Sequence, residues 1–433
     1  MVSTLVISPA SSPDGAAYFA RNSNRDPGEC QLVVTIPAVE RDSNTLLKCT
    51  HITISQVPHR FGVLLHKPWW CWGGDTGANE KGVVIGGESI ATRDHESESG
   101  LIGPDLVRLG LERGGTAEEA LGVITALLQT HGQGGACRLG DRSVGCDSSF
   151  ILADANEVWL LETAGRHWAA KRIQAMAVLS SRLTLATDYD RSSYALTQYA
   201  QLKGWSGRRE NVHFAAAFGQ QSRLRSTDDR WHRDFMLDKL ARLDSERLVF
   251  DLLNLLRLRK GTHPRWRSKS DMALYASGMS RSSQTSGSMV ARVSARRRDF
   301  FLTGTSAPDL SVFKPVYFSL PLEADLAGVD LSRYHADSLW WRQETLHRAM
   351  FLASRLDTQY LKERDELEKS MIVDLAAQKG RQLAQARRSI QQNLLEWEAS
   401  WSDRLATSKS LLHTCHPFTR FWKRQNRRDG ITL

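Results

Sequence analysis

The first 95 residues alternate short stretches of β-branched residues with residues that form turns. The stretches STLVIS, QLVVTIP, HITISQV and FGVLLH are six or seven residues long. Their length and their branched side chains are typical of β-strands. Pro13-Asp14-Gly15 predicts a tight turn, because proline fixes φ and glycine adopts the positive φ that many turns require. This part of the chain is therefore predicted to be mainly β-sheet.

Two helices are predicted after these strands. The first begins at Pro104 and ends at Gly114, since proline is favoured in the first turn of a helix and glycine just beyond the last. The second begins after Thr116, which forms a capping box with Glu119. The apolar residues of the second helix fall on one face, and they are Leu121, Ile124, Leu127 and Leu128. Both helices are therefore expected to pack against a sheet.

The remaining sequence repeats the order of strands followed by helices. SSFILAD and EVWLLET, joined by residues 154–156, predict a β-hairpin, and MAVLSSRLTL and DFFLTG predict further strands. Residues 228–260 predict a helix with a buried stripe of leucines (Leu248, Leu252, Leu255 and Leu256), and only Gly380 interrupts the helical pattern of residues 336–413. Strands joined by hairpins and grouped between helices predict an α+β fold with antiparallel sheets faced by helices.

The composition excludes several classes of protein. Hydrophobic residues make up 41% of the 433 residues and charged residues 24%, which is typical of globular proteins. No apolar run approaches the roughly 20 residues that span a bilayer. Six cysteines without a CxxC pair favour free thiols in a reducing compartment over a disulfide framework or a zinc site. We therefore expect a cytoplasmic protein without a membrane span, and the sequence indicates no metal and no cofactor.

Charge is distributed unevenly along the chain. Residues 1–200 hold 17 Lys and Arg against 22 Asp and Glu, whereas residues 201–433 hold 40 against 26. An acidic first half and a basic second half indicate two surfaces with different partners. Nucleic acid is not the expected partner, because no binding motif accompanies the charge. Trp397 and Trp401 lie on one helix face and predict either docking on the parent domain or a contact with a protein partner or a second copy.

Several blocks, in order between residues 18 and 318, resemble the secernins, and through them the cysteine dipeptidases with an N-terminal nucleophile. The blocks are FARNSNR, CTHITISQVP, GANEKGVVIGGES, GPDLVRLGLERG, HGQGG, EVWLLETAGRHWAAKRI and FLTGTSAPDLSVFKP. The resemblance implies an αββα sandwich of two antiparallel sheets, the fold of N-terminal-nucleophile hydrolases, over residues 1–325. Residues 326–433 are then a helical C-terminal extension with a basic tail.

The resemblance also implies a demanding catalytic arrangement. In the relatives the first residue after processing is a cysteine, whose free α-amine has a pKa near 8 and serves as the base for its own side chain. An Arg and an Asp on the next strand hold that amine and thiol. An Asn at the end of a later strand stabilises the oxyanion.

This chain departs from that arrangement at most positions. The nucleophile position falls on Val2, or on Ser3 if one gap is allowed, and no cysteine occurs before Cys30. The other family positions are Arg21, which is retained, Asn24 in place of the acid, Gly87 in place of the oxyanion Asn, and Ser181 in place of a further Asn. Losing one oxyanion donor typically lowers the rate about 10²–10³-fold. Arg21 itself is interpreted either as a retained site residue or as a structural ion-pair partner.

Three functions follow as hypotheses. The first is a catalytically degenerate member of the dipeptidase family that acts as a binding or scaffold protein. The second is a working dipeptidase or amide hydrolase, which requires removal of both Met1 and Val2 so that Ser3 becomes the terminal nucleophile. The third is a structural subunit of a larger assembly, favoured by the basic second half and the helical extension.

Overall fold

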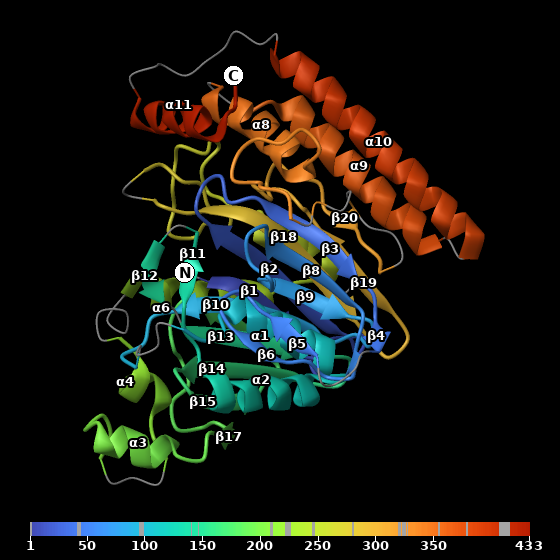
Figure 1. The fold of residues 1–433 in the computed structure, drawn as a ribbon. Helices are drawn as coiled ribbons and strands as arrows, with labels where there is room; N and C mark the ends of the chain where they lie inside the picture. The colour runs from blue at the N-terminus through green and yellow to red at the C-terminus, as the bar shows by residue number, and fades with distance from the viewer. Residues whose placement is uncertain are drawn as a thin grey trace.

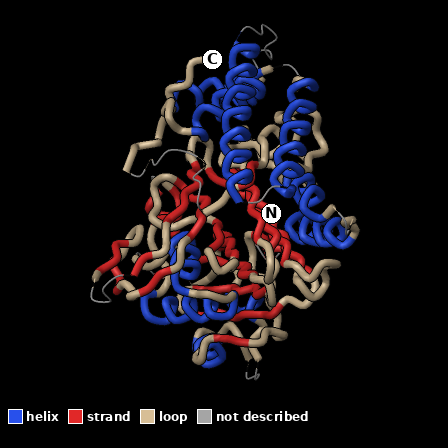
Figure 2. Tube along the Cα trace, turned by 90° about the vertical axis from the view of Figure 1, so that its right-hand side faces the viewer, coloured by secondary structure: helices blue, strands red, loops and turns tan. Residues whose placement is uncertain are grey.

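The fold is built on two antiparallel sheets (Figure 1). The computed structural model describes residues 2–40, 45–94, 99–139, 141–145, 147–207, 211–220, 227–244, 247–278, 281–318, 322, 326, 328–353, 356–377, 380–406 and 416–433. Figure 2 shows the strands in the middle of the molecule and the C-terminal helices above them. All statements below refer to these described residues.

The first sheet has six strands in the order β16-β1-β2-β18-β19-β20. They are β16 (Met176–Ser180), β1 (Val2–Ile7), β2 (Ala17–Arg25), β18 (Gln284–Val293), β19 (Arg298–Leu302) and β20 (Lys314–Pro315). The second sheet has eight strands, namely β17 (Arg191–Ser192), β15 (His167–Arg172), β14 (Val158–Ala164), β13 (Asp147–Ala153), β10 (Val84–Ile90), β9 (Thr76–Asn79), β8 (Val63–Pro68) and β3 (Gln31–Ile36).

Three short ribbons and the helices complete the fold. The ribbons are β4 (Val39–Glu40) with β7 (His59–Arg60), β5 (Leu46–Lys48) with β6 (Thr53–Ser55), and β11 (Ala136–Arg138) with β12 (Asp141–Gly145). The helices are α1 (Gly103–Arg113), α2 (Ala117–His131), α3 (Leu196–Leu202), α4 (Phe214–Phe218), α6 (Thr227–Ala241), α7 (Leu248–Leu256), α8 (Leu339–Leu352), α9 (Thr358–Ala377), α10 (Gly380–Ala406) and α11 (Pro417–Asp429).

Three hydrophobic clusters hold the elements in four layers. Phe19 of β2 and Ile151 of β13 belong to the cluster between the two sheets. The outer face of the eight-stranded sheet packs on α1 and α2, and that of the six-stranded sheet packs on α6 and α7. The predicted αββα sandwich is confirmed by this order of layers. The predicted cap of α2 is also present, since the amide of Glu119 donates to Oγ1 of Thr116 at 3.1 Å.

The predicted strand MAVLSSRLTL is only half correct, because β16 ends at Ser180. A buried carboxylate takes over the backbone beyond this point. Glu162 accepts the amide hydrogens of Thr184 at 2.6 Å and of Leu185 at 2.9 Å. These amides are therefore not available to a strand partner, although Leu185 itself is buried.

Two predicted helices are interrupted. Residues 228–260 form α6 and α7, and Asp251 in the first turn of α7 accepts the amide of Asp244 before it. Residues 336–413 break between α8 and α9, where Asp357 caps α9 by accepting the amide of Gln359 at 2.8 Å. In both places a carboxylate satisfies amide donors that a continuous helix would have paired internally.

Strand β18 was not predicted, although it lies at the centre of the first sheet. Its polar residues Ser286 and Ser288 conceal the strand pattern, yet both are buried. Between them, Gly287 faces the ring of His66 on the other sheet, and a Cβ built on Gly287 would lie 1.9 Å from that ring. A glycine is therefore required where β18 and β8 approach each other across the sandwich.

We expect Gly287→Ala to destabilise the fold by about 1–3 kcal/mol, because an added methyl group overpacks the contact with His66. Gly122→Ala is the control, since nothing lies within 4 Å of a Cβ on this exposed residue of α2. It should stabilise the helix by up to about 1 kcal/mol. Urea unfolding of both variants measures the two effects, and an unchanged midpoint for Gly287→Ala would contradict the predicted clash.

The C-terminal helices dock on the sandwich and on each other. Trp397 and Trp401 of α10 donate to Oε2 of Glu363 on α9 at 3.2 and 2.7 Å, and both rings pack on Tyr360. These contacts join α10 to α9 of the same helical extension, whereas the sequence predicted docking on the parent domain or on a partner. Trp401 is related to the parent domain through the hydrophobic cluster that it shares with Tyr275 and Leu310. The division of the chain into residues 1–325 and 326–433 stays a prediction.

Helix α11 is held by a buried ionic cluster. Arg348 of α8 contacts Glu344 at 2.7 Å and Asp429 of α11 at 2.8 Å, and all three side chains are buried. Gln284 of β18 donates to Glu344 at 3.1 Å, so the cluster reaches the first sheet. On the same face of α11, Gln425 donates to Asp429 at 2.9 Å and to the carbonyl of Pro27 in the β2–β3 loop at 3.0 Å. Helix α11 thus braces the loop that follows β2.

We expect Asp429→Asn to lower the free energy of unfolding by about 1.5–3 kcal/mol, because buried Arg348 loses one of its two carboxylate partners and keeps only Glu344. Glu366→Gln is the matched control, since its pair with Lys362 is about two-thirds exposed at 4.0 Å. It should change stability by less than about 1 kcal/mol. Equal losses in chemical denaturation would show that burial of the cluster has no special role.

Candidate functional site

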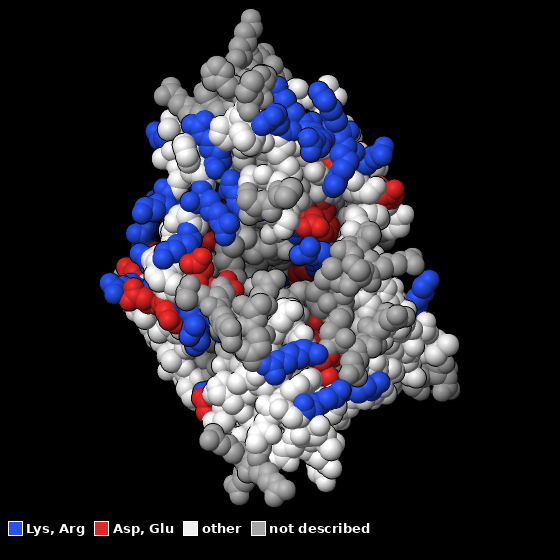
Figure 3. Space-filling view, turned by 90° about the vertical axis from the view of Figure 1, so that its left-hand side faces the viewer, with Lys and Arg blue, Asp and Glu red and all other residues white. Residues whose placement is uncertain are grey.

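A cleft of about 600 Å³ opens at one end of the sandwich. It lies where β2 and β10 end and where β13 and α1 begin. The ribbon strand β11, the start of α6 and the segment before β18 form its outer walls. β11 and α6 lie on the left-hand side of Figure 1, and the view from that side shows a hollow with acidic and basic side chains around it (Figure 3).

The structure brings the predicted site residues to this end of the sandwich. Arg21, Asn24, Gly87 and Ser181 line the cleft, whereas Ser3 is buried next to Arg21 beneath it. Val2 is the first residue of β1 and pairs with Ser180 at the end of β16. Oδ1 of Asn24 accepts a hydrogen bond from Oγ1 of Thr285 at 2.8 Å, so it anchors β18.

Arg21 joins the two sheets at the floor of the cleft. Its guanidinium donates to Oγ of Ser3 at 3.2 Å and to Oγ1 of Thr4 at 2.8 Å, both on β1. It also lies 3.4 Å from the carboxylate of Glu88 on β10. Arg21 is thus both a lining residue of the cleft and a structural ion-pair partner, so the two interpretations of the sequence describe the same side chain.

The two glycines at the end of β10 face opposite directions. A Cβ on Gly86 would lie 2.6 Å from the ring of Phe19 and 3.0 Å from Cδ of Arg21, so this position faces the other sheet. A Cβ on Gly87 would instead lie 3.1 Å from the ring of Phe150 and point toward α1. Gly87 therefore lines the cleft with its backbone. The loss of the oxyanion donor at this position stays a prediction.

Sequence reasoning missed an ion pair that dominates the cleft. Arg25 at the end of β2 forms a bidentate pair with Asp75, with Nε 3.0 Å from Oδ2, and lies 3.3 Å from Glu29. The signal was available, because side chains alternate along a strand and Arg25 shares the face of Arg21. The acid that matches Arg25 is far away in sequence, and no spacing rule connects them.

The pair sets the charge of the cleft floor. Burial acts to raise the pKa of Asp75, but the adjacent Arg25 outweighs burial, so the pKa lies below its ordinary value. Glu29 shows the opposite balance: burial raises its pKa, and Arg25 and the hydrogen bond from Trp70 compensate only in part. Asp75 is therefore the permanent anion of the floor, and Glu29 holds a proton more readily.

His66 lies behind this ion pair as a buried neutral base. Neither ring nitrogen has a hydrogen-bond partner among the described residues. Burial lowers the pKa of His66 to about 4, and the nearby Arg21 and Arg25 act in the same direction. The ring therefore stays uncharged in the folded protein and takes up a proton only when the protein unfolds in mild acid.

We expect stability to fall as the pH decreases from about 6.5 to about 4, because the unfolded state protonates His66 before the folded state does. The free energy of unfolding that neutral His66 contributes is fully present above the pKa of the unfolded state. As the pH falls below that value, it decreases by at most about 1.4 kcal/mol per pH unit. Urea unfolding at pH 7, 6 and 5 measures this slope. The His66→Asn variant should show a smaller slope of the free energy of unfolding against pH than the wild type. The variant of an exposed histidine, His59→Asn, is the control, and equal slopes in the wild type and both variants would refute the assignment.

The cysteines of the described residues do not supply a nucleophile at the cleft. Cys30, Cys49 and Cys71 are buried thiols outside any disulfide, and burial raises the pKa of Cys71 to about 12. Cys137 lines the cleft but is disulfide-bonded, which corrects the expectation of free thiols for this residue. Cys146 and Cys415 lie outside the described residues. Within the described ranges, no group of three or more His, Cys, Asp or Glu side chains is placed to hold a metal ion.

The fold and the cleft define an αββα protein with the architecture of N-terminal-nucleophile hydrolases. Residues 75–228 match the family model of peptidase family C69, which supports the resemblance that the sequence blocks indicated. This segment begins at Asp75 on the cleft floor and ends at the start of α6. It therefore contains β9, β10, α1, α2 and the whole β13–β15 meander.

Distant solved structures with similar folds were also found. Penicillin V acylase from Agrobacterium tumefaciens is 11% identical, with a TM-score of 0.41, over 76% of this chain and 87% of that one. Two variants of conjugated bile acid hydrolase from Clostridium perfringens are 11% and 14% identical, each with a TM-score of 0.38. They cover 69% and 70% of this chain and 88% of theirs. The assignment of the fold rests on the sheet order and the layers described above. Of the helices in the described part of the chain, none has the length and apolarity to cross a membrane.

Proposed function

We propose that this protein binds a small charged ligand in the cleft and no longer catalyses amide hydrolysis. The observation that carries the proposal is the state of Ser3. Its side chain is buried, its Oγ accepts a hydrogen bond from Arg21, and it is not among the residues that line the cleft. Because Val2 precedes it in β1, its nitrogen is a peptide nitrogen and cannot serve as a base.

The other hydroxyl groups of the cleft support the same conclusion. Five serines line it, but no histidine or lysine does so among the described lining residues (Ser89, Ser148, Ser181, Ser282 and Ser283). A serine inside the chain becomes nucleophilic through a neighbouring base, of which histidine and lysine are common examples. The charges remain, however, and a concave site with converging polar groups supports ligand binding. A cytoplasmic location, and a protein partner or second copy at the C-terminal helices, stay predictions.

We expect no hydrolysis of a panel of dipeptides above the uncatalysed background, because an active enzyme of this type accelerates the reaction by at least about 10⁶-fold. Calorimetric titration with the same panel should detect binding. Ser282→Trp should abolish it by filling the cleft, since Ser282 is an exposed lining residue. Ala295→Trp, an exposed substitution on the β18–β19 turn, is the control. Turnover that Ser3→Ala removes would overturn the proposal.

A working amidase with Ser3 as its first residue is the second candidate. The contact between Ser3 and Arg21 favours it, since the resemblance places an arginine next to the nucleophile. The intact mass and N-terminal sequence of the protein purified from its own cells separate the two proposals. A chain that starts at Ser3 supports the hydrolase, and a chain that retains Val2 removes it.

A further inference from the structure

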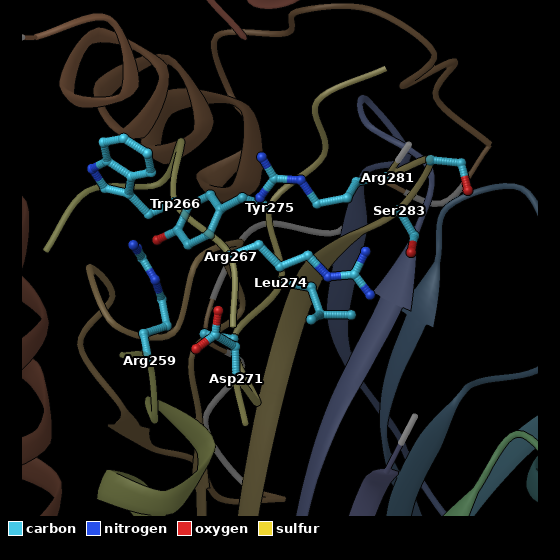
Figure 4. Close-up of a pocket in the computed structure, with 10 residues that line it drawn as sticks. Arg259, Trp266, Arg267, Asp271, Leu274, Tyr275, Arg281 and Ser283 are labelled. Carbon is cyan, nitrogen blue, oxygen red and sulfur yellow. The ribbon is translucent and has the colours of Figure 1, made fainter. Parts of the chain in front are cut away.

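A second, smaller pocket of about 190 Å³ adjoins the cleft. It is formed by the segment between α7 and β18. Its charged lining residues are Arg259, Arg267, Arg281 and Asp271. In Figure 4, Arg259 and Trp266 lie on one side, Arg281 and Ser283 lie on the other, and Arg267 and Tyr275 lie between them. Three guanidinium groups thus meet in a pocket with a single carboxylate.

That carboxylate and one of the arginines are already used by the fold. Asp271 is buried and accepts the amide hydrogens of Lys260 at 2.9 Å and Ser268 at 2.7 Å. Arg259 pairs with Asp309 at 2.9 Å and lies 4.6 Å from the ring centre of Tyr275. Arg259 is therefore already paired, and Asp271, which acts to raise the pKa of Arg281, is the one carboxylate among the lining residues that offsets the two remaining guanidinium charges.

The other two arginines have no acidic partner. Arg281 donates to Oγ of Ser277 at 2.7 Å and to the carbonyl of Arg265 at 3.1 Å, which are neutral acceptors. Burial lowers its pKa, and Arg267 and Arg259 add repulsion. Arg267 is exposed and has no hydrogen bond or ion pair to any described residue. A bound anion would relieve this repulsion and accept the free N–H groups of Arg267.

The pocket borders the cleft, because four residues line both: Arg267, Leu274, Ser282 and Ser283. Leu274 and the exposed ring of Trp266 provide an apolar wall beside the arginines. In the cleft itself, Asp26 and Asp228 have no ion pair with any described cation. One extended ligand can therefore place an anion at the arginines and a cation at these acids.

We propose that the arginine pocket binds the C-terminal carboxylate of a short peptide that lies in the cleft with its ammonium group toward Asp26 and Asp228. This inference rests on the proposed function. Arg267 recognises the carboxylate, and Trp266 with Leu274 favours an apolar side chain on the last residue. A carboxylate fits better than a larger anion, because a pocket of about 190 Å³ must also hold that side chain.

Calorimetric titration with four probes tests the inference: Gly-Leu, Gly-Leu-amide, N-acetyl-leucine and inorganic phosphate. We expect Gly-Leu to bind at least about tenfold more tightly than its amide, since a hydrogen bond to a charged group contributes about 1.5–3 kcal/mol. Arg267→Gln should weaken Gly-Leu by about tenfold and leave the amide within twofold. Arg296→Gln is the control, because this exposed arginine lies beyond the far end of β18, about 30 Å from the pocket at 3.3 Å per residue.

The outcomes separate the two proposals. If neither the dipeptide nor its amide binds, the proposed binding function fails. If both bind equally, or if Arg267→Gln affects them equally, the function stands and the carboxylate pocket is wrong. N-acetyl-leucine tests the pocket without an ammonium group, and no saturable binding of it to the wild-type protein also overturns the inference. Phosphate that binds more tightly than N-acetyl-leucine and is lost in Arg267→Gln would reassign the pocket to phosphate.

Discussion

The bidentate ion pair between Arg25 and Asp75 is the contact on which this end of the molecule depends. Arg25 comes from the six-stranded sheet and Asp75 from the loop before β9 of the eight-stranded sheet. The backbone of Asp75 also donates to His66 on β8 and accepts from Gly87 on β10, each at 3.0 Å. One residue therefore fixes three strands of one sheet and carries the charge that holds the other. A buried charge is costly when its partner is out of reach. The pair therefore also fixes the separation of the sheets where the cleft opens.

The sequence predicted the parts of the fold whose patterns are local. Four strands of residues 1–95 (β1, β3, β6 and β8), the cap at Thr116 and the leucine stripe of α7 depend on neighbours within a few residues. The errors share one physical cause, namely a partner that is distant in sequence. The pattern of β18 did not indicate a strand, because Gly287 must leave room for the ring of His66, some 200 residues earlier in the sequence. The strand β16 ends at Ser180, because Glu162 accepts the amide hydrogens of the residues that follow.

The candidate site shows the same division. The family positions could be located by alignment, and five of the six residues, from Ser3 to Ser181, gather around one cleft or just below it. The ion pair of Arg25 and the arginine pocket could not be found in this way, since their partners come from separate segments. Fixed charges of both signs line the floor and walls of the cleft. Under the proposed binding function, these charges recognise a zwitterion without acting on it.

Helix α11 reaches back to a loop made near the start of the chain. Gln425 bonds to Pro27 across 398 residues of sequence, and Asp429 packs against Gly28 in the same loop. That loop follows Arg25 and carries Asp26 and Glu29 into the cleft. During synthesis the two sheets can pair as soon as β20 has left the ribosome, but the loop has no brace until α11 emerges. On this basis we expect the nascent protein to form the sandwich before the loop beside the cleft is fixed, so the proposed binding site is complete only when the final helix arrives.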